Sequence, residues 1–487
     1  MGTLQRWKSQ PRRFPAAVRM GFVVAWLWDA RVAISCSGRQ VVSFDFGWKH
    51  RAGLHGWPDD PYEPPINTTA TGRGYVDPGD GPAEASVIYN GTSDWIDVDI
   101  PHDGIISNPF GNAPSLRACP DGCSGRSFIP RHVLWYRKQF RLPSGGDGDE
   151  SSAPASSLSW QEELVEGRSR IYLRFDGSFR NTTVYLNGRR VATHECGYTP
   201  FRIELTPSIL GLREAPPGNG GSTERSDAVH TVAVFVDPNN GDGGGPARGS
   251  GWWYEGGGLY RHAWLEKVPR SGRLSHEGVF VTSEPVFSGA PPPGPSAAAV
   301  VRASMRIRAT FEIEDPNEIY CYAFTVRESE TGWGPEHDSV GRAGMIQTST
   351  RSLNVSSSET NDDVTIITVS ERLLIENPIL WTSSHPHLYE VTSALYKGCG
   401  TSDGYDTASG LTLLDETSVH HGIRSTRFDP KTGFYWNEEP YKIRGFCDHD
   451  TFAVVGMAVP DRINLFRVSE IVANPRIRER HILIVAT

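Results

Sequence analysis

The stretch YWNEEPYKIRGFCDHDTF, residues 435–452, decides the fold, because the pattern of the chain changes within it. Its apolar segment 441–446 predicts a strand, and after a loop a helical pattern follows at residues 461–473. The apolar side chains of that helix fall on one face: Leu465, Val468 and Val472. A strand, a loop and a helix form the repeating unit of an α/β barrel, so we expect such a unit to begin here.

The chain before this stretch has the pattern of β-structure. Residues 171–175, 183–186 and 230–236 alternate in the way that half-buried strands do. Asn187-Gly188 follows the second of these runs and predicts a two-residue hairpin turn, because both residues accept a positive φ. We therefore predict a sandwich of two sheets over residues 41–270. Segments rich in Gly, Ser, Pro and Glu interrupt it as predicted surface insertions: 144–169, 213–228 and 237–250.

A second all-β region is predicted over residues 276–427. Its strand patterns lie at 278–282, 303–309, 363–369 and 388–392. Short strands at this spacing are typical of an immunoglobulin-like sandwich. Residues 430–487 then hold the predicted start of the α/β domain. A complete barrel needs about 250 residues, so we expect this one to be truncated.

Composition excludes several classes of protein. The formal net charge of −9 leaves no basic stripe to neutralise phosphates, so we expect no nucleic-acid partner. The 487 residues contain no apolar run of 18, and we expect no membrane span. The sequence shows no metal-ligand spacing, and Gly256-Gly257-Gly258 lacks the strand-then-helix context of a phosphate loop. We therefore expect no cofactor.

The N-terminal residues 1–40 are predicted to be a signal peptide or a disordered leader. Basic residues precede an apolar run at 20–28, and small residues follow it, although Asp29 and Arg31 interrupt the pattern. This order favours a secreted or endomembrane, for example vacuolar, protein. Cys119 and Cys123 would then form a small local disulfide. Glycosylation sequons agree with a secreted glycoprotein and begin at Asn67, Asn90, Asn181 and Asn354.

Five motifs occur in one order along the chain: WIDVDIPHD (95–103), WYRKQF (135–140), FDG (175–177) with VYLNG (184–188), WWYEGGGLYR (252–261), and GIR (422–424) with the passage 434–449. Together they resemble glycoside hydrolase family 2, the family of β-galactosidases, β-mannosidases and β-glucuronidases. The likeness covers roughly residues 41–468. The WWYEGGGLYR and FCDHDTF segments bring it nearest to β-galactosidase-type members.

The resemblance implies a jelly-roll sugar-binding domain, then an immunoglobulin-like domain, then an (α/β)₈ TIM barrel that carries the chemistry. It also implies retaining hydrolysis of a β-galactoside or a related glycan by two glutamates. In the family both glutamates lie at the ends of later barrel strands. We therefore expect the catalytic acid and nucleophile to be absent from these 487 residues and the chain alone to be inactive. The alternative from another class is a secreted, non-catalytic carbohydrate-binding module.

Glu438 is the most tempting catalytic candidate, because the acid of this family also follows an asparagine. However, Asn437-Glu-Glu-Pro440 lies between two strand-like segments, where the family has a hairpin turn. A glutamate in such a turn is solvated, so nothing raises its pKa toward that of a useful acid. We therefore interpret Glu438 as a turn residue.

The candidate substrate-binding residues are His449, Trp252, Trp253 and Glu255. His449 matches a histidine that contacts the sugar in the family; the alternative is a surface or core histidine. The aromatic pair and Glu255 could reach the rim of the barrel, since flat aromatic faces suit sugar C–H surfaces, or pack the sandwich core. For His102 and Asp103 we expect a structural role at a domain interface.

Overall fold

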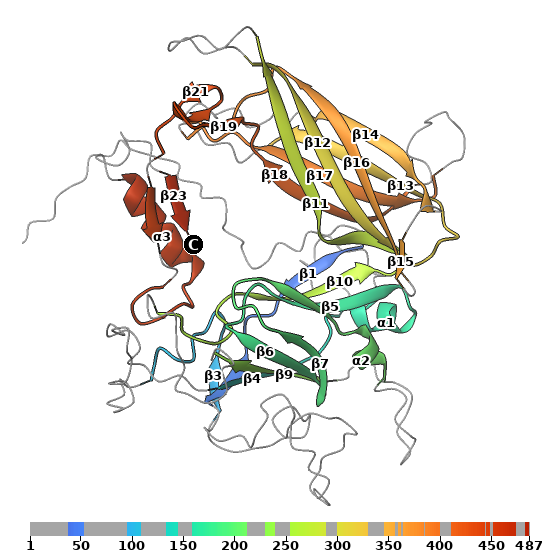
Figure 1. The fold of residues 1–487 in the computed structure, drawn as a ribbon. Helices are drawn as coiled ribbons and strands as arrows, with labels where there is room; N and C mark the ends of the chain where they lie inside the picture. The colour runs from blue at the N-terminus through green and yellow to red at the C-terminus, as the bar shows by residue number, and fades with distance from the viewer. Residues whose placement is uncertain are drawn as a thin grey trace, which may run out of the picture.

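The computed structural model describes residues 38–52, 95–108, 133–144, 158–211, 229–238, 254–288, 300–329, 345–355, 359–361, 364–383, 385–399, 411–443, 445–448, 451–473 and 483–486. Two β-sandwiches lie one above the other, and a smaller C-terminal segment lies beside them (Figure 1). The mainly β architecture that the sequence predicts is confirmed. Among the described residues, no helix combines the length and apolar content needed to cross a membrane.

Several predictions concern residues outside this description. They include the signal sequence or leader up to residue 37, the sequons at Asn67 and Asn90, and the pair Cys119 and Cys123. They also include most of the predicted insertions 213–228 and 237–250.

The first sandwich contains two antiparallel sheets. The six-stranded sheet has the order β3-β2-β4-β9-β6-β7, with the bounds Ile96–Val98, Trp48–Ala52, Leu134–Phe140, His230–Asp237, Asn181–Leu186 and Arg189–His194. The four-stranded sheet has the order β1-β10-β5-β8, with the bounds Gln40–Ser43, Ala263–Pro269, Ser169–Phe175 and Phe201–Glu204.

The core of this sandwich takes side chains from both sheets. Trp48 and Tyr136 contribute from one sheet and Leu173 and Phe175 from the other, all fully buried. Each such side chain contributes about 1.5–3 kcal/mol through the apolar surface that it removes from water. The predicted hairpin at Asn187-Gly188 is confirmed, since both residues have positive φ values, 52° and 89°.

Two short helices flank the four-stranded sheet, α1 (Trp160–Val165) and α2 (Thr206–Gly211). Helix α1 begins with a capping box, in which the Ser159 side chain and the Glu162 side chain each accept from the other's backbone N–H. Trp160 and Leu164 then bury its inner face. The prediction of a surface insertion over 144–169 is therefore wrong at its C-terminal end, because local capping and two apolar residues form a packed helix there.

The second sandwich also contains two antiparallel sheets. One has the order β11-β12-β16-β15, with the bounds Gly272–Phe287, Val300–Ile313, Val364–Glu376 and Glu359–Asn361. The other has the order β14-β13-β17-β18, with the bounds Met345–Leu353, Tyr320–Glu328, Tyr389–Lys397 and Thr412–His421. A disulfide between Cys321 and Cys399, whose Cα atoms are 6.1 Å apart, links β13 to the residues after β17.

Ion pairs join the two sandwiches. Arg39, just before β1, donates to both carboxylate oxygens of Asp415 in β18, at 2.9 and 2.7 Å. Asp415 is fully buried. Glu314, which follows β12, pairs with Arg170 of the first sandwich and with Arg273 of β11. Paired charges at a buried boundary fix the two sandwiches relative to each other.

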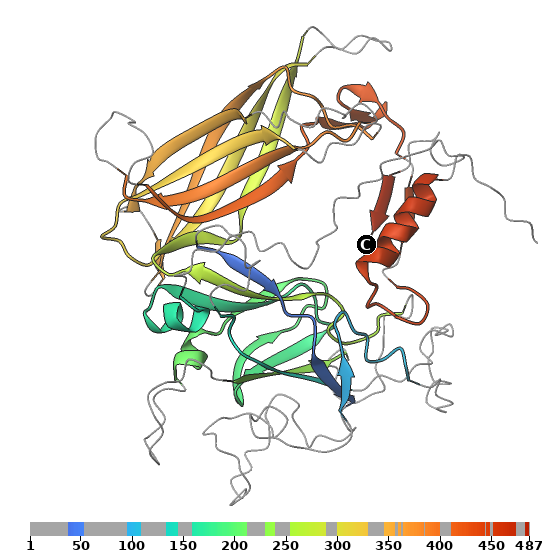
Figure 2. The same cartoon turned by 180° about the vertical axis from the view of Figure 1, so that it is seen from behind.

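The C-terminal segment begins with the small sheet β19-β20-β21 (Thr426–Asp429, Gly433–Trp436 and Glu439–Pro440). It continues with β22 (Gly445–Asp448), α3 (Asp461–Ala473) and β23 (Leu483–Ala486). Strands β22 and β23 pair in parallel, and α3 lies beside β23 (Figure 2).

The helix predicted at 461–473 is confirmed. The strand predicted at 441–446 is wrong in its position, because 441–443 follow the small sheet and the parallel strand begins at 445. A parallel β-α-β unit is common to α/β folds in general, so the barrel itself stays a prediction.

Candidate functional site

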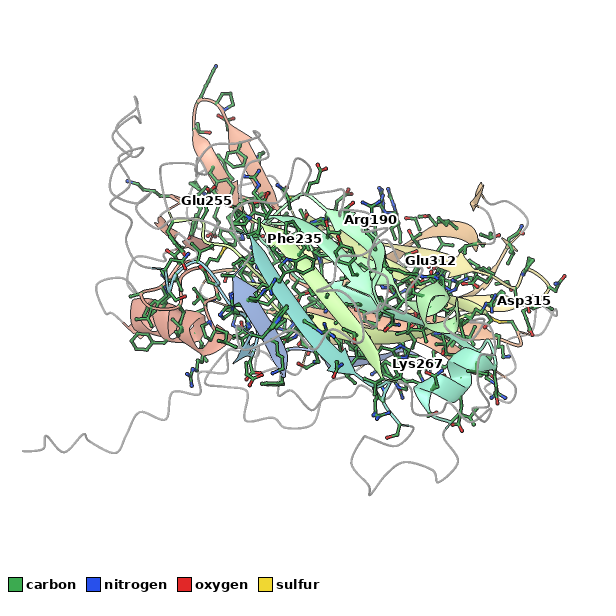
Figure 3. All side chains as sticks on the ribbon, turned by 90° about the horizontal axis from the view of Figure 1, so that it is seen from below. Arg190, Phe235, Glu255, Lys267, Glu312 and Asp315 are labelled. Carbon is green, nitrogen blue, oxygen red and sulfur yellow. A yellow bond between two sulfur atoms is a disulfide. The ribbon has the colours of Figure 1, made fainter. Side chains whose placement is uncertain are left out.

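One of the four predicted substrate-binding residues lies within the described structure. His449, Trp252 and Trp253 fall outside it. Glu255 is buried, between Tyr254 and Gly256, and it lies on the side of the molecule that holds α3 (Figure 3). Its contact with substrate stays a prediction. The residues around Glu255 form a junction between the first sandwich and the C-terminal segment.

The centre of this junction is the buried carboxylate of Asp103. Its Oδ1 accepts hydrogen bonds from the backbone N–H groups of Ile105 at 2.9 Å, Ile106 at 3.3 Å and Gly257 at 3.3 Å. Its Oδ2 accepts the hydroxyl proton of Tyr254 at 2.9 Å. Asp103 therefore joins the loop after β3 to the segment that precedes β10.

The same carboxylate also holds the C-terminal segment. The backbone N–H of Met457 donates to Asp103 Oδ2 at 3.0 Å. Gly256 and Gly456, with φ values of +62° each, pass so close to this oxygen that a Cβ on either residue would overlap with it. Two glycines thus allow two segments, 200 positions apart in the chain, to approach one carboxylate.

Apolar packing surrounds this hydrogen bond. Met457 and Ala458 form a buried cluster with Phe179 and Tyr260 of the first sandwich. The Tyr260 hydroxyl donates to the carbonyl of Gly197 at 2.8 Å, which fixes the ring against the cluster. The contact between the segment and the sandwich is therefore both apolar and hydrogen-bonded.

His262 makes a second link between the same two parts. Its Nδ1 lies 2.7 Å from Asp45 Oδ2, and its Nε2 lies 3.4 Å from Asp461 Oδ2 at the first turn of α3. The hydrogen bond to Asp45 raises the pKa of His262, and the charges of both carboxylates add to that effect. A protonated His262 can donate to one carboxylate on each side of the junction.

Three rings pack against one another beside Asp103: the buried rings of His50 and Tyr136 and the partly buried ring of His102. His102 Nδ1 lies 2.9 Å from the hydroxyl of Tyr136, and the ring of His50 is 4.9 Å from the rings of both. Burial lowers the pKa of His102 to about 4, so its imidazole is neutral at physiological pH. Burial also raises the pKa of Tyr136 well above its usual range.

The chemistry of the junction is positioning rather than proton transfer. Burial raises the pKa of Asp103, which taken alone suits a general acid. However, the carboxylate accepts five hydrogen bonds, which occupy the roughly four lone-pair directions of its oxygens. No direction remains for a substrate proton. The expectation that His102-Asp103 serves a domain interface is confirmed for Asp103, whereas His102 bonds within its own sandwich.

Glu438 occupies the turn that the sequence predicts. Asn437 and Glu438 have φ values of 51° and 65°, as a two-residue hairpin turn between β20 and β21 requires. Glu438 is partly exposed, and its Oε2 lies 3.5 Å from Arg427 Nε. Asn437 Oδ1 accepts from the backbone N–H of Ser425 at 2.9 Å, which ties the turn to the residue just before β19. Glu438 is therefore a turn residue.

Sequence reasoning missed His262 and Met457. His262 directly follows the WWYEGGGLYR motif, and its place next to this motif could have identified it as a candidate. Met457 contributes a backbone N–H, which no residue-type pattern identifies. Among the described residues, no three His, Cys, Asp or Glu side chains gather as a metal ion would need.

Comparisons with known proteins agree with this architecture. The model of a family described as "Glycosyl hydrolases family 2" matches residues 336–411, in the second sandwich. A β-galactosidase of Bacteroides ovatus is 24% identical over 376 residues, which are 76% of this chain and 33% of that protein. A β-glucuronidase of Formosa agariphila is 22% identical over 350 residues, 69% of this chain and 28% of that protein. The chain spans about a third of the length of these curated relatives.

Solved structures show the same fold. The structure of a putative β-galactosidase from Bacteroides fragilis superposes with a TM-score of 0.56 at 19% identity, covering 89% of this chain and 48% of that one. A β-glucuronidase from Bacteroides uniformis gives a TM-score of 0.56 at 21% identity, covering 92% of this chain and 42% of that one.

Proposed function

This chain belongs to glycoside hydrolase family 2, and we propose that it forms the non-catalytic part of a β-galactosidase-like enzyme. In this role its two sandwiches position the catalytic domain of the enzyme through the Asp103 junction. The whole enzyme would hydrolyse a β-galactoside or a related glycan with retention, using two glutamates about 5–5.5 Å apart. The chain by itself would not hydrolyse glycosides.

The observation that carries this proposal is the hydrogen bond from Met457 N–H to Asp103. It ties the loop after the first parallel strand to the first sandwich, at the position where a barrel would begin. Three other buried carboxylates of the described structure form ion pairs: Asp45 with His262, Glu266 with Arg174, and Asp415 with Arg39. A carboxylate held in this way supports the structure and is not available as a nucleophile.

The substrate in this proposal is a β-galactoside. The FCDHDTF and WWYEGGGLYR motifs favour this sugar, and the relatives named above include both β-galactosidases and β-glucuronidases. The disulfide Cys321–Cys399 supports a secreted or endomembrane location, since disulfides persist in oxidising compartments.

Hydrolysis of nitrophenyl β-galactoside, β-glucuronide and β-mannoside by the purified chain tests the proposal. We expect no turnover above the uncatalysed rate with any of the three. Turnover that Glu438→Gln abolishes would contradict both the proposal and the assignment of Glu438 to a turn. Turnover that Glu438→Gln leaves intact would contradict the proposal alone.

A secreted carbohydrate-binding module without any catalytic partner is the second candidate. Trp252 and Trp253 favour it by residue type, since flat aromatic faces suit the C–H surfaces of sugars. Titration with galactan and with galacto-oligosaccharides separates the candidates. Binding that is lost in Trp252→Ala and Trp253→Ala supports the module, and absence of binding to every glycan argues against it.

A further inference from the structure

An arginine-rich face covers one side of the second sandwich. Alternate residues of β12 and β16 point away from its core, as the pleat of a strand requires. The buried residues of β12 include Met305, Ile307 and Ala309, so the residues between them face outward. We call the outward-facing, exposed Arg306, Arg308 and Arg372 the arginine face.

The register of the strands brings these charges together. Arg306 lies directly opposite Arg372 across the β12–β16 ladder, and Arg308 is the next outward residue of β12. Residues directly opposite in an antiparallel pair have Cβ atoms about 4.5–5.5 Å apart, and like charges in such a pair are destabilising. Strands β11, β12 and β16 run side by side in Figure 1, and the register and exposure of the three arginines place them on the outer face of this sheet.

The arginine face has no ion-pair partner among the described residues. Within the described part of the chain, no carboxylate forms an ion pair with Arg306, Arg308 or Arg372. Two outward-facing carboxylates lie at the edge of the face: Glu376 is opposite Arg302, and Glu284 is opposite Ser304, diagonal to both Arg302 and Arg306. This arrangement occurs in a protein whose formal net charge is −9.

An aromatic ring extends the face. Phe280 of β11 lies opposite Arg308, with 56% of its surface exposed, and the guanidinium carbon of Arg308 is 5.2 Å from its ring centroid. The face therefore combines charge with a flat apolar surface. Like charges directly opposite each other on paired strands are destabilising, and proteins accept such local conflicts mainly at functional sites.

We propose that the arginine face binds an anionic polysaccharide, one that carries carboxylate or sulfate groups. Arginine forks bind planar carboxylates and sulfate oxygens with paired N–H groups, and Phe280 offers a ring for the C–H surface of a sugar. An extended chain with regularly repeated charges fits a flat, two-stranded row of guanidinium groups. The choice of a glycan over another polyanion rests on the proposed function, in which the chain acts on carbohydrate.

Affinity electrophoresis of the intact chain tests this proposal. The probes are polygalacturonate for carboxylate, carrageenan for sulfate, and a neutral galactan. We expect at least one anionic probe to retard the wild type, and the retardation to weaken between about 50 and 200 mM salt. The triple variant Arg306→Gln, Arg308→Gln, Arg372→Gln should lose about tenfold in affinity, because three exposed charge contacts are removed.

A matched control removes the same charge elsewhere. The variant Arg327→Gln, Lys431→Gln, Lys442→Gln changes three other exposed basic residues and should bind like the wild type. Both variants should keep the wild-type melting temperature, since all six side chains are exposed.

Three outcomes would overturn the proposal. They are equal affinity of the triple variant and the wild type, equal binding of the neutral galactan, and equal binding of single-stranded DNA. The last would indicate a general polyanion surface. The binding assay needs no turnover, so its failure is distinct from a failure of the proposed function in the nitrophenyl glycoside assay.

Discussion

The substitution Asp103→Asn separates the two roles of the Asp103 carboxylate, which are to stabilise the first sandwich and to hold the C-terminal segment. An asparagine keeps the shape of the side chain but offers one acceptor oxygen and one NH₂ donor group. The oxygen is expected at the Oδ1 position, where three backbone N–H groups converge from Ile105, Ile106 and Gly257. The NH₂ group then replaces Oδ2, which faces Met457.

The substitution should weaken the docking of the C-terminal segment. The Tyr254 hydroxyl can rotate and accept from the new NH₂ group, but the N–H of Met457 can only donate. One hydrogen bond to a charged acceptor is lost, and a buried N–H is left without a partner, which costs about 2 kcal/mol. The undocked population of the segment should rise about 30-fold. The stability of the first sandwich should change little. A neutral amide does not carry the cost of burying a negative charge, the cost that raises the pKa of Asp103.

Hydrogen exchange and limited proteolysis measure this effect. The amide of Met457 should exchange about 30-fold faster in the variant, and trypsin should cleave sooner after the exposed Arg462. The control is Tyr254→Phe, which removes the other bond to Oδ2 and leaves the Met457 bond in place. Unchanged exchange at Met457 in Asp103→Asn would refute the docking role. A general collapse of the melting transition would show instead that Asp103 stabilises the sandwich core.

Three further predictions follow from the buried charges and glycines. The pKa of His262 is raised above 6.5, so its stabilisation is complete below pH 6.5 and is lost as the pH rises through the folded value. The melting temperature should therefore fall as the pH rises through the folded pKa of His262. A His262→Gln variant whose melting temperature depends on pH as in the wild type would contradict this. Asp415→Ala leaves Arg39 buried without its counter-charge and should cost about 3–5 kcal/mol in urea unfolding; a cost below about 1 kcal/mol would refute the link between the sandwiches. Gly456→Ala would place a methyl group against the junction carboxylate, so proteolysis of the C-terminal segment should accelerate as in Asp103→Asn, and wild-type resistance would argue against the close approach.

Local patterns located several of the elements. The alternation at 171–175 and 230–236 lies within β5 and β9, and the helical pattern at 461–473 coincides with α3. Burial on one face imposes a period of two on strands and 3.6 on helices, although β9 itself is buried along its whole length. The pattern misplaced β22, whose pairing with β23 is a long-range contact that no local period reports.

Turn chemistry was predictable for the same local reason. Few residue types tolerate a positive φ, and Asn and Gly are among them. The dipeptide Asn187-Gly188 therefore identifies its own turn. The turn at Asn437-Glu438 followed from its place between two strand-like segments, and its geometry explains why Glu438 is not a buried acid. The sequence left the disulfide partner of Cys321 open, since pairing depends on where the fold brings Cα atoms within reach.

The sequence by itself determined the two sandwiches, the strand-to-helix change after residue 440 and the family resemblance, because each depends on residues close together in the chain. Only the tertiary structure decided which groups Asp103 binds at the predicted interface. Its five donors come from three separate parts of the chain. The three outside its own loop are the backbone N–H groups of Gly257 and Met457 and the hydroxyl of Tyr254. Backbone donors carry no side-chain signature. Asp103, for which the sequence predicts a role at an interface, therefore holds the C-terminal segment against the first sandwich through donors that the sequence could not identify.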